Sequence, residues 1–223
     1  MEIAHTGPSA AAKLVEQTGL MPVGFPAALP FPPGKSPFSV KGSYYKELQD
    51  RLVDWEGIMN SVDDAAVRDF GRQRFLASEW YDYMPVLFMA RGLGVYLGCP
   101  PDEAITEQAI RNAKRQLSGI YKFVLSFTSP EVGMRRMRSV YRQIYNFGRC
   151  DITISGNTAV TSYHQWPAMM AWLYQVTTDA WVGTLLKISG ATRITRDWAE
   201  PVSDGIRDGI ELVKLEVRTT WAR

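Results

Sequence analysis

Through the first two thirds of the chain, apolar residues recur at the three- and four-residue spacing of amphipathic helices. This spacing predicts a helix over 42–53 and a short helix that begins at Ser61. A stronger helix is predicted over 78–97, capped by Ser78, with Pro85 after its first turn, where the ring either kinks the helix or shifts its start. Its predicted apolar face consists of Trp80, Met84, Leu87, Phe88 and Val95.

Two further helices follow with clear start signals. Asp102 begins the first, because an acidic residue favours the positive end of a helix. The second begins at Ser129-Pro130-Glu131, which combines a capping residue, a proline at the first helical position and an acid. It is predicted to end at Gly148, since glycine readily adopts the left-handed conformation found after a helix.

The periodicity changes after this point. Alternating residues over 150–163, interrupted by a Gly-Asn pair, predict a β-hairpin. A long apolar helix is predicted over 167–189, and two more strands over 192–198 and 210–221 flank a polar loop. The order predicts an α+β fold, in which N-terminal helices are followed by an antiparallel sheet of two hairpins with the long apolar helix between them. We expect one such domain over 40–223.

The first 39 residues differ in character, because they hold seven of the 13 prolines. Proline rings remove backbone donors, so the run over 22–38 cannot sustain a helix. A short helix over 9–18 can precede it. The apolar residues of this run predict a proline-rich N-terminal arm over 1–39 that lies on the domain surface or on a partner subunit.

Composition indicates a globular protein, with 46% apolar and 22% charged residues among 223. Cys99 and Cys150 form no disulfide framework, and no secretory signal precedes the domain, so cytosolic thiols and a cytoplasmic location are expected. The most apolar stretch, 168–188, contains polar and charged residues, so no membrane span is predicted.

The sequence contains no catalytic motif that we can identify. The two histidines, His5 and His164, and two separated cysteines cannot supply an ordinary zinc site, so no metal site is predicted. His164, at the end of a predicted strand, either bonds to nearby backbone, contacts a ligand or takes part in acid–base chemistry.

Charge is segregated along the chain. The segment 111–149 holds nine basic residues and one acid, whereas the whole chain has a net charge of only +2. Arg135, Arg138 and Arg142 share one stripe of the predicted helix that begins at Ser129. The stripe is either a solvated face or a site for an anion or partner, since guanidinium groups match phosphate and carboxylate. Nucleic acid is disfavoured, because no recognition motif accompanies the stripe.

Other candidates lie on apolar faces. Arg91 shares the angular position of Trp80 on the predicted helix over 78–97, so it must pair with an acid such as Glu79 or Glu47, or meet a ligand. The helix over 167–189 is apolar nearly all round, which suits a core, a subunit contact or an apolar ligand pocket. The candidate ligand contacts are Met170, Tyr174 and Trp181 on this helix, together with Trp80, Arg91 and His164.

Several short motifs carry a family resemblance. They are Val40-Lys-Gly, Phe75-Leu-Ala-Ser-Glu-Trp-Tyr, Ser129-Pro-Glu, Gly148 and the closing strand. Over about 40–221 the chain resembles an uncharacterised paralogous domain family of myxobacteria, which is distantly similar to the haem–nitric-oxide-binding and 4-vinyl-reductase group of small-molecule sensor domains. The resemblance implies a helix-plus-antiparallel-sheet domain used in sensing or regulation. Haem sensors of that group carry a Tyr-x-Ser-x-Arg motif that this sequence lacks, which argues against haem, and no cofactor is predicted.

Three functional classes follow from these observations. The first is a non-enzymatic, sensor-like domain that binds a hydrophobic or anionic small molecule and works as a homodimer or larger homo-oligomer. The second is an enzyme acting on an anionic, partly apolar substrate, with Glu79, Tyr81, Arg91 and His164 as candidate machinery. The third is an assembly protein that ties subunits together through the proline-rich arm.

Overall fold

The computed structural model describes residue 26 and the ranges 28–51, 54–118 and 129–223. The helix expected over 9–18 and most of the arm lie outside these residues. The helical part contains β1 (Ser39–Lys41), α2 (Gly42–Arg51), α3 (Trp55–Asn60), α4 (Ala65–Arg72), β2 (Trp80–Asp82), α5 (Pro85–Leu97), α6 (Pro101–Ser118) and α8 (Pro130–Ile144). The rest contains β3 (Arg149–Ser155), β4 (Thr158–Pro167), the short 3₁₀ helix η1 (Ala168–Met170), α9 (Ala171–Ile188), β5 (Arg193–Trp198), β6 (Val202–Arg207) and β7 (Ile210–Ala222).

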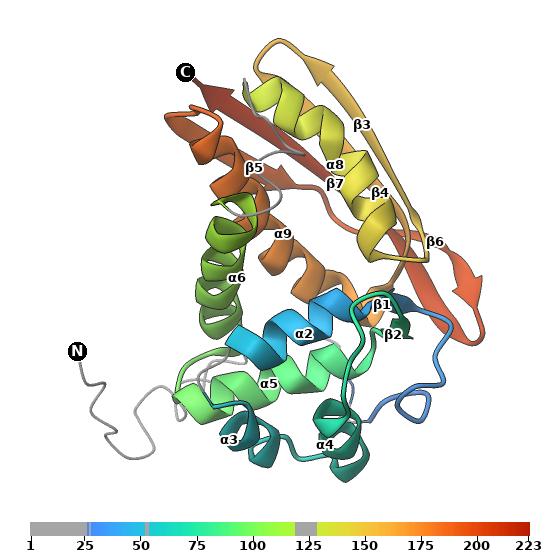
Figure 1. The fold of residues 1–223 in the computed structure, drawn as a ribbon. Helices are drawn as coiled ribbons and strands as arrows, with labels where there is room; N and C mark the ends of the chain where they lie inside the picture. The colour runs from blue at the N-terminus through green and yellow to red at the C-terminus, as the bar shows by residue number, and fades with distance from the viewer. Residues whose placement is uncertain (1–25, 27, 52–53, 119–128) are drawn as a thin grey trace.

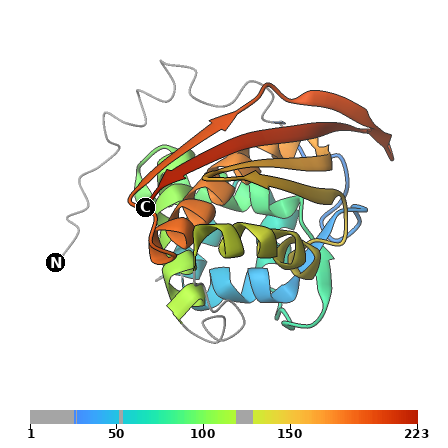
Figure 2. The same cartoon turned by 90° about the horizontal axis from the view of Figure 1, so that it is seen from above.

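The main sheet is antiparallel, in the order β3-β4-β7-β5, and β6 pairs with the other end of β7. Its register is set by pairs such as Tyr163 with Leu215 and Trp198 with Val217. Figure 2 shows the helices gathered on one face of this sheet. Helix α9 packs against β5 and β7, and α8 against β3 (Figure 1). The predicted α+β fold is therefore confirmed.

Several local predictions were wrong. No helix begins at Ser61, which ends α3, and α4 begins at Ala65 with Asp64 as its N-cap. Helix α8 ends at Ile144, before Gly148.

Trp80 lies in strand β2 and not on a helix, because the helix begins only at Pro85, whose fixed backbone angle suits the first helical position. The segment predicted as a polar loop contains β6, whose residues are almost all exposed, so no apolar alternation marks it. Its backbone is held by pairing with β7, from Val202 opposite Lys214 to Arg207 opposite Ile210.

The motif segments Val40-Lys-Gly and Phe75–Tyr81 are in contact. Strand β1 pairs with β2, and the Gly42 amide donates a hydrogen bond to the Glu79 carbonyl at 2.8 Å. A side chain at Gly42 would place its Cβ 2.0 Å from the Leu76 carbonyl oxygen. The backbone at Leu76 therefore approaches position 42 so closely that only glycine, which has no Cβ, fits there.

The core is rich in aromatic rings. Trp166, which is fully buried, stacks on Tyr174 with ring centres 3.7 Å apart. The described end of the proline-rich segment joins the same core, since Phe38 is fully buried and Phe31 packs against it. This core links strand β4 to helix α9.

Glu131 joins the first turn of α8 to the end of β7. Its carboxylate accepts hydrogen bonds from Trp221 Nε1 at 3.2 Å and Arg223 Nη2 at 2.6 Å. Hydrogen bonds lower the pKa of this carboxyl from 4.5 to about 2. The Ser129 hydroxyl makes the largest contribution, and the Arg223 and Trp221 donors add to it. The stabilisation it provides is therefore present above about pH 4.5 and is lost as the pH falls towards 2.

We expect Glu131→Gln to lower the free energy of unfolding at pH 7 by about 1 kcal/mol, because it removes the charge from these hydrogen bonds. Urea denaturation at pH 7, 4.5 and 2.5 measures the effect, and the difference from wild type should shrink across this series. Glu211→Gln, at an exposed position of the same strand β7, is the control. An equal difference at all three pH values would contradict the assignment.

Candidate ligand-binding cavity

A partly open cavity lies among the helices. It has a volume of about 170 Å³ and is partly open to solvent. An apolar cavity of about 150 Å³ can hold a molecule of the size of benzene, so this space suffices for a small molecule. The cavity is lined by faces of α2, α3, α5, α6, α8 and α9.

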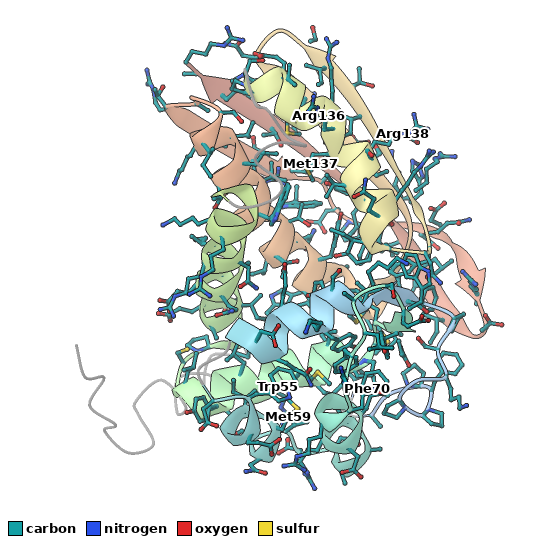
Figure 3. All side chains as sticks on the ribbon, in the orientation of Figure 1. Trp55, Met59, Phe70, Arg136, Met137 and Arg138 are labelled. Atoms are coloured by element: carbon teal, nitrogen blue, oxygen red, sulfur yellow. The ribbon has the colours of Figure 1, made fainter. Side chains whose placement is uncertain are left out.

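Each long helix turns residues spaced by three and four towards this space. Helix α6 contributes Ile105, Gln108, Ala109 and Asn112. Helix α5 contributes Val86, Met89, Ala90 and Leu93, and α8 contributes Met137, Val140, Tyr141 and Ile144. Helix α9 contributes Leu173, Tyr174, Thr177, Thr178, Trp181 and Val182. In Figure 3, Trp55 on α3 and Met137 on α8 mark lining residues that come from opposite ends of the helical part.

Four tyrosines form part of the lining: Tyr44, Tyr141, Tyr145 and Tyr174. Burial raises the pKa of Tyr44 to about 12. Burial likewise raises the pKa of the Tyr141, Tyr145 and Tyr174 hydroxyls well above the ordinary value of 10. These hydroxyls therefore stay protonated and uncharged at neutral pH.

The polar part of the lining is small. The Gln108 amide donates a hydrogen bond to Asn112 Oδ1 at 3.1 Å, and the Thr177 hydroxyl donates to the Leu173 carbonyl at 2.8 Å. Among the described lining residues the one ionisable acid is Glu47, and none is lysine, arginine or histidine. The wall is thus apolar and aromatic, with a few hydrogen-bonding groups and no positive charge in the described part.

The structure brings two of the candidate ligand contacts together. Tyr174 and Trp181 both line the cavity from α9. Met170 is fully buried in the adjoining core and is not among the lining residues. Trp80 is 40% exposed on β2, where Lys41 Nζ lies 4.1 Å from the centre of its ring.

Arg91 and His164 lie elsewhere. Arg91 on α5 forms an ion pair with Asp63 at 3.1 Å. The acid in this ion pair is therefore neither Glu79 nor Glu47, the two considered from the sequence. His164 on β4 lies between Asp151 at 3.6 Å and Asp204 at 3.7 Å. Neither residue lines the cavity.

The residues of the enzyme hypothesis have separate partners. The Tyr81 hydroxyl accepts a hydrogen bond from the Leu76 amide, and the Glu79 carbonyl accepts one from the Gly42 amide. In the described parts of the chain, histidine, cysteine and acidic side chains form no group of three that could hold a metal ion.

Helix α8 has the two faces that its sequence predicts. Arg135, Arg138 and Arg142 are exposed, and the opposite face lines the cavity. Figure 3 shows Met137 and Arg138 on different sides of the helix. Arg138 lies 4.0 Å from Asp151 of β3, so one arginine of the stripe has an acidic neighbour.

Several lining residues were missed from the sequence. Gln108 and Asn112 lie one turn apart in the apolar repeat of α6, and this break in an apolar face was a usable signal. Tyr44 and Trp55 carry no such signal, because only packing places α2 and α3 beside the same space. Within the described ranges, no helix is long and apolar enough to cross a membrane.

Comparison with known proteins identifies structures with a similar fold, but no related sequence family. No protein-family model and no curated protein matches the chain. Solved structures of H-NOX domains, which bind haem and nitric oxide or oxygen, do match. A Cs H-NOX mutant has a TM-score of 0.57 at 16% identity, with 82% of this chain and 97% of that chain covered. A T. tengcongensis H-NOX mutant gives 0.56 at 16% identity, covering 82% and 95%.

An oxygen-binding H-NOX domain related to soluble guanylate cyclases, solved as its oxygen complex, gives 0.55 at 16% identity, covering 82% and 93%. The distant similarity to haem–nitric-oxide-binding sensor domains is therefore confirmed at the level of the fold. The chain spans nearly the whole length of these domains.

Proposed function

We propose that this chain is a non-enzymatic, sensor-like domain that binds a small apolar molecule in the cavity among α2, α5, α6, α8 and α9. The observation that carries the proposal is the cavity itself, a space of about 170 Å³ lined by apolar faces of five long helices and by α3. Folded proteins fill their interiors closely, so an apolar space large enough for a small molecule favours a ligand site. The H-NOX fold, which belongs to ligand-sensing domains, supports the same class.

The described lining does not fit haem, the group bound by the structural neighbours. Haem iron needs an axial ligand such as histidine, cysteine, methionine or a tyrosine phenolate. His164 is outside the lining, and His5 lies outside the described residues. Burial holds the lining tyrosines in their protonated form. The described lining also lacks a cation to pair with haem propionates. Met89 and Met137 also line the cavity, but methionine ligates haem iron together with a histidine, which the described lining lacks.

A route from the cavity to the sheet supports a sensing role. Tyr174 lines the cavity and stacks on Trp166 of β4. Tyr174 also lies edge-on to Tyr163 of the same strand, with ring centres 4.8 Å apart. A ligand that displaces Tyr174 therefore changes the packing of β4 directly.

The uncharged fluorophore N-phenyl-1-naphthylamine tests the proposal, because its emission rises in apolar surroundings. We expect saturable binding to wild type and an affinity at least about tenfold weaker for Ala109→Trp, whose indole would occupy the cavity. Ala66→Trp, on the exposed face of α4, is the matched control and should bind as wild type does.

Thermal denaturation of both variants shows whether they are folded. Folded Ala109→Trp with wild-type affinity would place the probe outside the cavity and remove the support for the proposal.

We also propose a cytoplasmic homo-oligomer, from the sequence features alone. Native mass spectrometry of the full chain counts the subunits and shows whether a small molecule is retained. A variant that lacks residues 1–25 keeps Phe31 and Phe38, which pack in the core, and so tests whether the first part of the arm contributes to assembly.

A further inference from the structure

Two amide side chains face the mainly apolar cavity from one helix. Gln108 and Asn112 lie one turn apart on α6, and both are partly buried. Gln108 Nε2 donates a hydrogen bond to Asn112 Oδ1 at 3.1 Å. The unbonded polar atoms of the pair are not fully buried, so an occupant that covers them must replace their contact with water by hydrogen bonds. The pair therefore favours an occupant that carries a polar group.

The bond between the two amides leaves a defined pattern. Gln108 retains its carbonyl oxygen as an acceptor, and Asn112 retains its NH₂ group as a donor. Turning both amides over exchanges the two roles and leaves the same result, one donor beside one acceptor. This pattern is complementary to a group that itself presents an acceptor next to a donor, as a carboxamide or a lactam does.

The remaining walls define the rest of the occupant. Aromatic side chains from four helices face the space, among them Trp55 on α3 and Trp181 on α9. Rings favour offset-stacked or edge-to-face contacts with other rings. The acidic Glu47, together with the lack of a basic side chain in the described lining, disfavours an anion. Of the two ligand types considered from the sequence, hydrophobic and anionic, the cavity therefore favours the hydrophobic one.

We propose that the cavity selects an uncharged, flat aromatic ligand with an amide-like edge, which Gln108 and Asn112 recognise by one accepted and one donated hydrogen bond. The inference rests on the proposed function and adds the chemical class of the ligand. Primary amides, lactams and nucleobase-like heterocycles belong to this class.

Three probes that share one ring system test the inference: naphthalene, 2-naphthamide and 2-naphthoate. Quenching of tryptophan fluorescence at pH 8 gives their affinities. We expect 2-naphthamide to bind about tenfold more tightly than naphthalene, as two modest hydrogen bonds allow. We expect 2-naphthoate, an anion at this pH, to bind at least about a hundredfold more weakly than the amide.

Variants assign the preference to the two amides. Gln108→Leu and Asn112→Leu keep similar volume and should reduce 2-naphthamide to the affinity of naphthalene, while naphthalene binds at least as tightly as before. Gln143→Leu, at an exposed position on α8, is the control and should leave all three affinities unchanged.

The outcomes separate this inference from the function on which it rests. Equal affinity of wild type for naphthalene and 2-naphthamide, or tighter binding of 2-naphthoate, would overturn the inference but leave an apolar ligand site in place. Failure of all three probes, together with failure of N-phenyl-1-naphthylamine, would overturn the proposed function as well. The comparison of probes on wild type decides the question even where a leucine variant does not fold.

Discussion

Replacing Trp166 with alanine is expected to lower the free energy of unfolding by about 3–5 kcal/mol. The indole is fully buried and lies at the centre of an aromatic cluster. It stacks on Tyr174, and its ring centre lies 5.1 Å from that of Phe147 and 5.2 Å from that of Tyr145. Removing it deletes a large apolar surface and leaves a void that rigid neighbouring rings cannot fill.

The same change should weaken ligand binding. Tyr174 is held between Trp166 and the cavity, so the loss of the indole frees this lining residue to move. Denaturation by urea measures the loss of stability, and titration with N-phenyl-1-naphthylamine measures the affinity. Trp80→Ala removes the same side chain at a site that is 40% exposed, and should cost no more than about 1 kcal/mol. Equal losses at the two sites would contradict the burial of Trp166.

Asp82→Ala is expected to cost about 2–4 kcal/mol. This carboxylate is 4% exposed and accepts hydrogen bonds from the Gly34 amide at 2.9 Å, the Met84 amide at 2.9 Å and the Ser36 hydroxyl. The Ser36 amide donates a fourth bond at 3.2 Å. Alanine would leave these donors without an acceptor in a partly buried region, and unsatisfied donors are costly.

Asp82→Ala should also loosen one segment in particular, in addition to lowering the stability of the whole domain. Asp82 holds residues 34–36 against the start of α5, so limited proteolysis should cut the variant first in this segment. Asp50→Ala, at an exposed position on α2, should change stability by less than about 0.5 kcal/mol. Wild-type stability and wild-type resistance to proteolysis in Asp82→Ala would show that these hydrogen bonds contribute nothing net.

Local chemistry in the sequence was sufficient where it acts over a few residues. Ser129-Pro130-Glu131 predicted the start of α8, where the Ser129 hydroxyl accepts a hydrogen bond from the Val132 amide. Gly156-Asn157 predicted the turn between β3 and β4, where Gly156 has a φ of 54°. These signals are reliable because capping and turn formation depend on neighbouring residues alone.

Long-range packing decided the elements that lack such signals. Strand β6 exists because β7 supplies its hydrogen-bonding partners, and its own exposed residues show no apolar alternation. Trp80 has an apolar side chain at helical spacing from Met84, yet pairing of β2 with β1 places it in a strand. Periodicity alone cannot distinguish these cases, because both conformations bring the same residue types to a surface.

The amino-acid sequence by itself determined the α+β class, the order of the main helices and strands, and the inward face of α8, but not that of α5, since Val95 of its predicted apolar face is 62% exposed. It determined these because helix and strand periodicities set which side chains share a face. Only the tertiary structure decided that the inward faces of α5, α6, α8 and α9 do not close on one another and leave a cavity, with Gln108 and Asn112 in its wall. A cavity depends on how complementary the volumes of distant side chains are, and that property belongs to no single segment of the chain.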